Sequence, residues 1–135
     1  DQAIDHFYKA LEIKPTHAGV HTNLSIALRR QGRLDEALDH SIRSVQNNPD
    51  LAEAHNNLGI SLFQKGRVEE ALQEFRKALE LKPDYTTCYY NLGVVLENQH
   101  RTEEAAESFR QALRLDPFHG QAQQRLTLLL EEAGP

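Results

Sequence analysis

Two histidines four residues apart are the first residues whose spacing could support chemistry. His17 and His21 would share one face of a helix, a spacing that can hold a metal ion. No Glu stands beside them in an HExxH arrangement, so helix-end and packing roles are favoured. Cys88, the single cysteine, has no His–Asp constellation around it and is not expected to be a nucleophile.

Pairs of acids and the glycines give no stronger sign of catalysis. The pairs at 69–70 and 103–104 fit first-turn partners of a helix dipole better than acid–base catalysts. The glycines do not form a phosphate-binding loop. We therefore predict a protein that is not an enzyme, with no catalytic residue, no metal and no cofactor.

Adjacent asparagines in the stretch AHNNLGISL are a different kind of signal. Asn56 and Asn57 fall inside an expected helix, where each Asn costs about 0.5 kcal/mol relative to Ala. A carboxamide offers both a donor and an acceptor, which suits a peptide backbone. Either the fold or a ligand is expected to use this pair.

Composition narrows the class of partner. The 135 residues carry a net charge of −5, which argues against a nucleic-acid partner. No long apolar run or secretory signal is present, so no membrane partner is expected. One cysteine is compatible with a reducing compartment, and a cytoplasmic or nuclear location is expected.

The chain repeats at a constant interval, which indicates an array of small units. Residues that recur at this interval, the repeat step, are Pro15, Pro49, Pro83 and Pro117, then Ala3, Ala37, Ala71 and Ala105, then Leu24, Leu58, Leu92 and Leu126. Apolar periodicity predicts eight helices, at 2–14, 17–31, 34–47, 51–65, 68–81, 85–99, 102–115 and 119–132. Complete repeats are expected at 18–51, 52–85 and 86–119, with a lone second helix at 1–17 and a terminal first-type or capping helix at 120–135.

Short connections are expected to mark the helix ends. Gly32 and Gly66 end the first helices of two units, whereas His100 takes the glycine's place in the third and predicts a more strained connection. Thr16, Asp50 and Asp84 are the expected N-caps of the helices that follow them.

The residues at fixed positions in each unit resemble the tetratricopeptide repeat (TPR) family. The signature is Leu58-Gly59 in the first helix, then Ala71, Phe75 and Ala78 in the second, and a closing Pro. The resemblance covers essentially the whole chain and implies an all-α fold, a right-handed superhelix (α-solenoid) of about eight antiparallel helices. Two departures, Ser25 for Gly and Ser41 for the aromatic, are expected to loosen packing in residues 18–51. The aromatic usual in the first helix is replaced as well, by His21, His55 and Tyr89.

The resemblance also gives the asparagines a role. On a helical wheel Asn57 falls opposite the packing stripe, and Asn23 and Asn91 stand one repeat step before and after it. In the TPR family this face lines the concave groove. The column resembles the asparagine ladder in the TPR arm of O-linked N-acetylglucosamine transferase, which implies hydrogen bonds to the backbone of an extended peptide. The alternative is that these amides bond a neighbouring helix and support the scaffold.

Other groove positions follow from the same alignment. Ile26, Ile60 and Val94 form an apolar column, which could instead be buried against the second helices. Arg29 and Arg30 make one end of the groove positive, while Glu97 and Glu131 make the other negative. Phe63 and Tyr90 are candidate pocket residues, and Asn56 is expected at the rim. The predicted peptide-binding set is Asn23, Asn57, Asn91, Asn56, Ile26, Ile60, Val94, Arg30, Gln64 and Asn98.

Two alternatives stay open beside a module that binds extended peptides, self-association and an arm of a larger enzyme, whereas a chaperone-type clamp is disfavoured. A chaperone-type carboxylate clamp, a TPR subclass, matches only at Asn57. Self-association could use the end helices, where apolar residues are expected to be exposed: Ile4, Phe7, Leu11, Leu126, Leu129 and Leu130. The array could also be the substrate-recruiting arm of a larger enzyme such as a glycosyltransferase.

Overall fold

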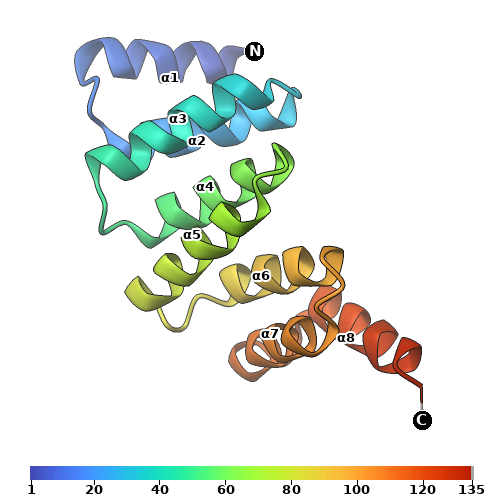
Figure 1. The fold of residues 1–135 in the computed structure, drawn as a ribbon. Coiled ribbons are helices and arrows are strands. Elements are labelled where there is room, and N and C mark those ends of the chain that lie inside the picture. The colour runs from blue at the N-terminus through green and yellow to red at the C-terminus, as the bar shows by residue number, and fades with distance from the viewer. Residues whose placement is uncertain (135) are drawn as a thin grey trace. The chain divides into compact units, whose positions relative to one another are not determined.

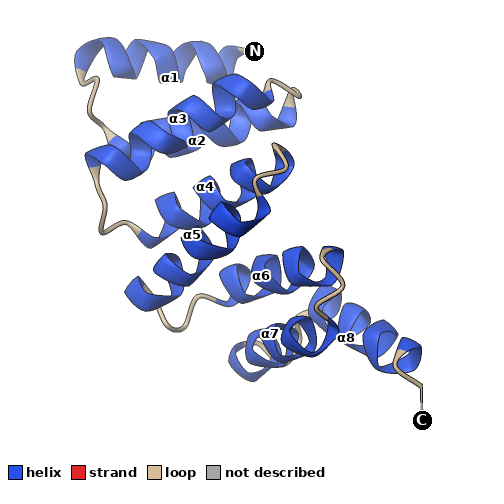
Figure 2. Ribbon diagram, viewed as in Figure 1, coloured by secondary structure: helices blue, strands red, loops and turns tan. Residues whose placement is uncertain are grey.

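The computed structural model describes residues 1–134, and every regular element in that range is an α-helix (Figures 1 and 2). The helices in chain order are α1 (Gln2–Ile13), α2 (Ala18–Arg30), α3 (Leu34–Asn47), α4 (Ala52–Gln64), α5 (Val68–Leu81), α6 (Thr86–Asn98), α7 (Thr102–Leu115) and α8 (Gly120–Glu132). The all-α class is confirmed, and the helix ends lie close to the expected ones. No helix within residues 1–134 is both long and apolar enough to cross a membrane.

The helices gather into two compact units. Unit 1 is Asp1–Leu81 and holds α1 to α5, whereas unit 2 begins at Lys82 and holds α6 to α8. In unit 1, α2 packs on α3 and α4 packs on α5, and further contacts join α1 to α2, α3 to α4 and α2 to α4. In unit 2, α7 packs on both α6 and α8. Each unit thus consists of helices that pack against their chain neighbours.

The helix caps differ from the expected ones. Asp50 and Asp84 do not cap α4 and α6, because these helices begin one residue later and the cap position falls on Leu51 and Tyr85. Thr16 is also displaced as a cap, because the His17 ring accepts a hydrogen bond from the backbone N–H of Val20 at 3.2 Å. A histidine ring therefore takes the capping role that a hydroxyl or carboxylate usually has.

The connections after α2, α4 and α6 all use a left-handed residue. Gly32 and Gly66 have φ of 77° and 80°, and His100 has φ of 58° at the corresponding place. A side chain in this region crowds its own backbone, whereas glycine does not. The strain predicted at His100 is confirmed.

Close contacts between an aromatic ring and a glycine set the packing of two helix pairs. A Cβ on Gly59 would lie 2.7 Å from the Phe75 ring, and one on Gly93 would lie 2.6 Å from the Phe109 ring. Both rings are fully buried. The small residues of the repeat signature are therefore needed for α4 to reach α5 and for α6 to reach α7.

Hydroxyl groups replace this ring contact between α2 and α3. Ser25 and Ser41 stand at the glycine and phenylalanine positions, are fully buried, and lie 2.6 Å apart through their Oγ atoms. Each hydroxyl also lies within hydrogen-bonding distance of the carbonyl of Ala37, at 2.8 and 2.9 Å. Hydrogen bonds thus fill space that a ring fills in the later pairs.

The end helices expose less apolar surface than expected. Ile4 is buried in the core formed with α2, so its predicted exposure is wrong, whereas Phe7 and Leu11 pack on the same core and are half-buried. Leu126 and Leu129 are buried as well, again against expectation. Exposed apolar area remains on α8, at Leu130 and Leu128, which are 49% and 48% exposed.

Candidate peptide-binding surface

The candidate surface of unit 1 is formed by one face of α2 and the corresponding face of α4. Asn23, Ile26 and Arg29 lie on α2, and Asn57 and Ile60 lie on α4; we call these five residues the asparagine face. Asn57 and Ile60 stand one repeat step after Asn23 and Ile26, so they occupy equivalent positions on equivalent helices. Contacts between α2 and α4 bring the two helices together.

A hydrogen bond from Arg29 to Asn57 joins the two helices. The guanidinium Nη1 donates to the Asn57 side-chain oxygen at 2.7 Å and lies 3.3 Å from the Ser61 hydroxyl oxygen. The Asn57 amide nitrogen donates in turn to Ser41 Oγ at 3.1 Å. Both ends of this amide therefore have partners within the protein.

Burial separates Asn57 from the other two asparagines of the column. Asn57 is only 3% exposed, so the expectation that it points away from the packing is wrong. The helical wheel placed it opposite the α5 contact, but α2 and α3 cover that side through Arg29 and Ser41. Asn23 is exposed and Asn91 is half-buried. As a peptide ligand, Asn57 stays a prediction.

The remaining predicted residues differ in exposure. Ile26, Ile60 and Val94 are half-buried, so they keep apolar surface in contact with solvent. Arg30, Gln64 and Asn98 are exposed. Asn56 is only 6% exposed, so its expected place at the rim is wrong.

Arg29 is half-buried and lies next to a second positive charge. Burial lowers the pKa of its guanidinium, and the neighbouring positive charge of Arg30 lowers that pKa further. Among residues 1–134 the half-buried arginines are Arg29, Arg101 and Arg125. Arg101 pairs with Glu104 at 2.8 Å and Arg125 pairs with Glu97 at 2.7 Å, whereas Arg29 has no carboxylate partner among the described residues.

Unit 2 contains a charged counterpart of the Arg29–Asn57 link. Arg125 on α8 stands one repeat step after Asn91 and continues the asparagine column. It donates from Nη1 to Glu97 of α6, and its Nε lies 3.2 Å from the Tyr90 hydroxyl. The Glu97 hydrogen bond is the main reason that the pKa of Arg125 is raised. Sequence reasoning missed this residue, although the repeat step points to it.

Buried histidines near the starts of α2 and α4 act as paired hydrogen-bonding groups. The Nε2 of His21 lies 2.7 Å from the Pro15 carbonyl, which only accepts, so this nitrogen carries a proton. Its Nδ1 lies 2.9 Å from His40 Nδ1, and one of these two nitrogens carries the shared proton. The second nitrogen of His40 lies 3.5 Å from the Tyr8 hydroxyl. The rings of His21 and His40 are stacked.

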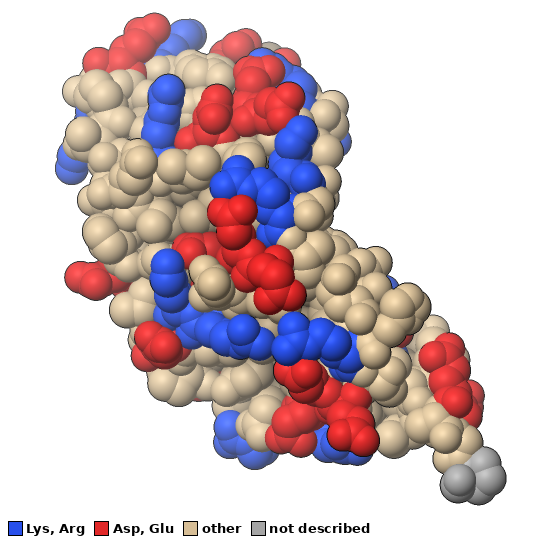
Figure 3. Space-filling model, viewed as in Figure 1, with Lys and Arg blue, Asp and Glu red and all other residues tan. Residues whose placement is uncertain are grey.

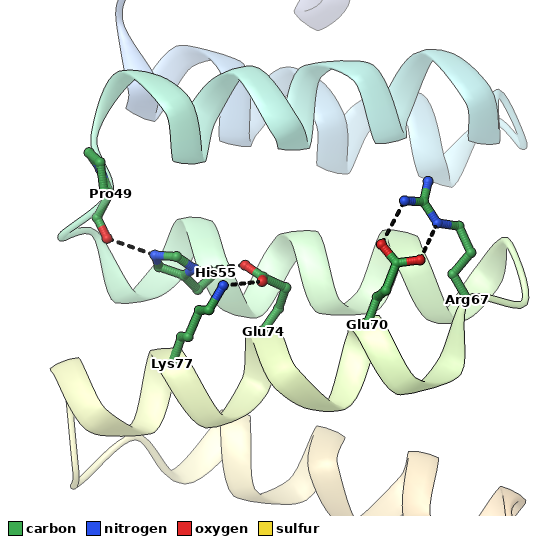
Figure 4. A network of polar contacts seen from close by, with 6 residues as sticks. All are labelled: Pro49, His55, Arg67, Glu70, Glu74 and Lys77. Atoms are coloured by element: carbon green, nitrogen blue, oxygen red, sulfur yellow. Dashed lines mark hydrogen bonds and ion pairs between the residues drawn. The ribbon is translucent and has the colours of Figure 1, made fainter.

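His55 makes the same contacts with an acid in place of His40. Its Nε2 lies 2.7 Å from the Pro49 carbonyl and its Nδ1 lies 2.8 Å from a Glu74 carboxylate oxygen (Figure 4). Lys77 also donates to Glu74, at 3.0 Å. Both partners of the ring are hydrogen-bond acceptors when Glu74 is ionised. The equivalent histidines thus have different partners, a second imidazole for His21 and a carboxylate for His55.

The two histidines with metal-binding spacing make structural hydrogen bonds, and the single cysteine is buried. His17 caps α2, and His21 bonds to Pro15 and His40, so these two histidines have the helix-end and packing roles that the sequence favours. Within residues 1–134 no group of three or more His, Cys, Asp or Glu side chains is placed to hold a metal. Burial raises the pKa of the Cys88 thiol to about 12, which keeps it protonated at neutral pH.

Arginines and glutamates repeat as ion pairs at the starts of the second helices. Arg33–Glu36, Arg67–Glu70 and Arg101–Glu104 have N–O distances of 2.7, 2.7 and 2.8 Å. Figure 4 shows the second of these pairs, and Figure 3 shows basic and acidic side chains interspersed over the face in view. These charges are neutralised locally, unlike that of Arg29.

A comparison with protein-family models decides the family. The tetratricopeptide repeat model matches residues 17–84 and 50–117. The chain belongs to the tetratricopeptide repeat family. No curated protein sequence matches it closely enough to be reported as a relative.

Solved structures agree with this fold. MamA superposes with a TM-score of 0.86 and 24% identity, over 97% of this chain and 77% of that one. The first TPR domain of Spaghetti (RPAP3) superposes with a TM-score of 0.83 and 22% identity, over 88% of this chain and 94% of that one. YrrB, also a TPR protein, superposes with a TM-score of 0.80 and 28% identity, over 90% of this chain and 63% of that one. The all-α TPR solenoid expected from the sequence is confirmed.

Proposed function

We propose that this TPR chain is a protein-interaction module that binds an extended peptide segment on the asparagine face. The observation that carries the proposal is the combination of half-buried apolar side chains, Ile26 and Ile60, with the fixed guanidinium of Arg29. A binding site for a peptide needs apolar contact area and a few oriented polar groups, and this surface offers both.

Two structural neighbours support the general assignment. The Spaghetti domain is described as bound to an HSP90 peptide, and YrrB is described as having an unusual peptide-binding site. Peptide binding is thus a use to which the same fold is put in other proteins. The choice of surface on this chain rests on its own residues.

The asparagines take different parts in the proposal. The exposed carboxamide of Asn23 would donate to and accept from the peptide backbone. Asn57, whose amide is already bonded to Arg29 and Ser41, would position the guanidinium. Arg30 and Gln64 would lie at the edges, with buried Asn56 supporting α4. On unit 2 the corresponding residues Asn91, Val94 and Asn98 of α6 are proposed to bind a peptide stretch in their own right.

Selection from a randomised library of nine-residue peptides tests this proposal. We expect the wild-type protein to retain library peptides and the variant Asn23→Ala/Ile26→Ala to lose at least tenfold in retention. The matched control is Gln73→Ala/Arg76→Ala, which changes two exposed residues on α5. Circular dichroism verifies folding. Retention that is absent in the wild type, or equal in the two variants, would contradict the proposal.

A second candidate function, self-association through α8, is favoured by one observation. Leu128 and Leu130 are each about half exposed, and Leu130 also lines a cavity of about 340 Å³ together with Leu129, Ala106 and Arg110. If this surface drives association, the mass measured by sedimentation equilibrium will rise with concentration and Leu130→Glu will abolish the rise. A concentration-independent monomer mass would remove this candidate.

A further inference from the structure

Arg29 carries a charge that has no carboxylate partner among residues 1–134. Its Nη1 is fixed by Asn57 and Ser61, and its Nε and Nη2 atoms make no hydrogen bond with the described residues. A guanidinium has five N–H donors in a planar fork, so one edge remains available. The side chain is half-buried, and its orientation is set by the protein.

The equivalent contact in unit 2 contains an anion, which the contact of Arg29 in unit 1 lacks. There the side chains that link the two first-type helices are Glu97 and Arg125, a cation with its anion. In unit 1 the linking side chains are Arg29 and the neutral amide of Asn57. Burial of a cation without an anion is costly, and the lowered pKa of Arg29 expresses this cost. A ligand carboxylate would offset it.

From this geometry we infer that the peptide partner carries clustered Asp or Glu side chains, one of which pairs with the free edge of Arg29. Arg30 is adjacent and exposed, so a second acid would meet a second positive charge. Apolar Ile26 lies one turn before Arg30 on α2, which places apolar contact beside the carboxylate. The inference rests on the proposed function and specifies the partner's chemistry.

The chain's net charge favours an acidic peptide over a nucleic acid as the source of the anion. A net charge of −5 opposes a long polyanion, which needs many cationic contacts. A short acidic segment requires only the local pair of arginines. Carboxylate geometry also matches the two parallel N–H groups along one guanidinium edge.

The first part of the test uses wild-type protein alone. Peptides retained from the nine-residue library are sequenced, and we expect Asp and Glu to be enriched at least threefold over the input. A retained acidic peptide and its Gln/Asn isostere are then compared by fluorescence anisotropy. We expect the isostere to bind about tenfold more weakly, as for loss of one charge-assisted hydrogen-bonded pair.

Variants then assign the effect to Arg29. Arg29→Gln is expected to weaken binding of the acidic peptide about tenfold and to leave the affinity for the isostere unchanged. Arg29→Lys is expected to have an intermediate effect, because it keeps the positive charge but loses the planar guanidinium. Arg76→Gln on α5 removes the same charge from an exposed site and should change neither affinity. Equal losses in Arg29→Gln and Arg76→Gln would overturn the inference.

The outcomes separate this inference from the proposed function. Retained peptides without acidic enrichment would leave peptide binding intact and refute the acidic partner. A wild-type protein that retains no peptide would refute both. Because the comparison of the acidic peptide with its isostere needs no variant, a folding defect in Arg29→Gln would not block the decision.

Discussion

Arg29 donates a 2.7 Å hydrogen bond to Asn57, a residue 28 positions later on the next first-type helix of the same unit. Glu97 and Arg125 repeat this relationship at the same separation in unit 2, also at 2.7 Å. At two positions of the asparagine column, residues 57 and 125, the side chain therefore joins α4 to α2 and α8 to α6. In unit 2 the link joins a cation to an anion, so both charges are paired. In unit 1 it joins a cation to a neutral amide, so the cation can pair with an acidic partner.

Asn57→Ala is expected to destabilise the fold by about 1–3 kcal/mol, because it removes the shorter of the two contacts of the half-buried Arg29 and one hydrogen bond of buried Ser41. Asn23→Ala, at the exposed equivalent position, is expected to change stability by less than about 0.5 kcal/mol. Urea denaturation followed by circular dichroism measures both. Equal midpoints for the two variants would show that the link contributes nothing.

Gly59→Ala is expected to destabilise by about 1–3 kcal/mol, because the added methyl group would lie 2.7 Å from the Phe75 ring. Gly120→Ala is the control, since a Cβ there meets nothing within 4 Å. Thermal unfolding should show a lower midpoint for the first variant and an equal or higher midpoint for the second. A midpoint for Gly59→Ala at the wild-type value would mean that the ring moves aside at no cost.

His100→Gly is expected to stabilise the protein by roughly 0.5–1 kcal/mol, because it relieves a side chain held at φ of 58°. The reverse change, Gly66→His, introduces the same strain at φ of 80° and is expected to destabilise by a similar amount. Denaturant midpoints of the two variants should move in opposite directions. Shifts in the same direction would refute strain at this turn as the cause.

The His21–His40 pair is expected to make the fold sensitive to acid. Burial, then the charges of His21 and Arg43, lower the pKa of His40, with weaker opposing effects from Asp39 and Glu36. The unfolded chain therefore binds more protons than the folded one below about pH 6.5. Stability is retained above that pH and falls as the pH drops from about 6.5 towards the lowered pKa.

The neighbouring repeat supplies the control for this pH effect. His40→Glu places an acid opposite His21, as Glu74 lies opposite His55. Between pH 7.5 and pH 5.5 the wild-type melting temperature is expected to fall by roughly 2–4 °C more than that of the variant. If the variant loses as much as the wild type over this range, the acid sensitivity comes from groups other than this pair.

The repeat step made most of the fold predictable. Leucine, alanine and proline positions one repeat step apart locate the helices because each unit must bury the same apolar stripe. Caps such as His17 and His119 were not predicted, because a ring that accepts from a backbone N–H three residues later has no composition signal. Asp50 was predicted as a cap because it directly precedes Leu51, which holds the N-cap position of α4.

The surface was less predictable than the fold. A helical wheel describes one helix, so it could not show that Arg29 and Ser41 from other helices cover Asn57. The alignment of repeats compares residues one repeat step apart, whereas the links that matter join residues 28 positions apart. Ser25 and Ser41 pointed to looser packing because their hydroxyls were considered singly, although together they bond to each other and to Ala37.

The most direct test of the central claim is to map a bound peptide on the ¹⁵N-labelled protein by amide chemical-shift changes, using a peptide recovered from the library. We expect the largest shifts within unit 1 at Asn23, Ile26, Arg29 and Ile60, with little change at exposed α5 residues such as Gln73 and Arg76. Shifts that fall on α5, or that are absent at saturating peptide, would contradict the assignment of the asparagine face as the binding surface.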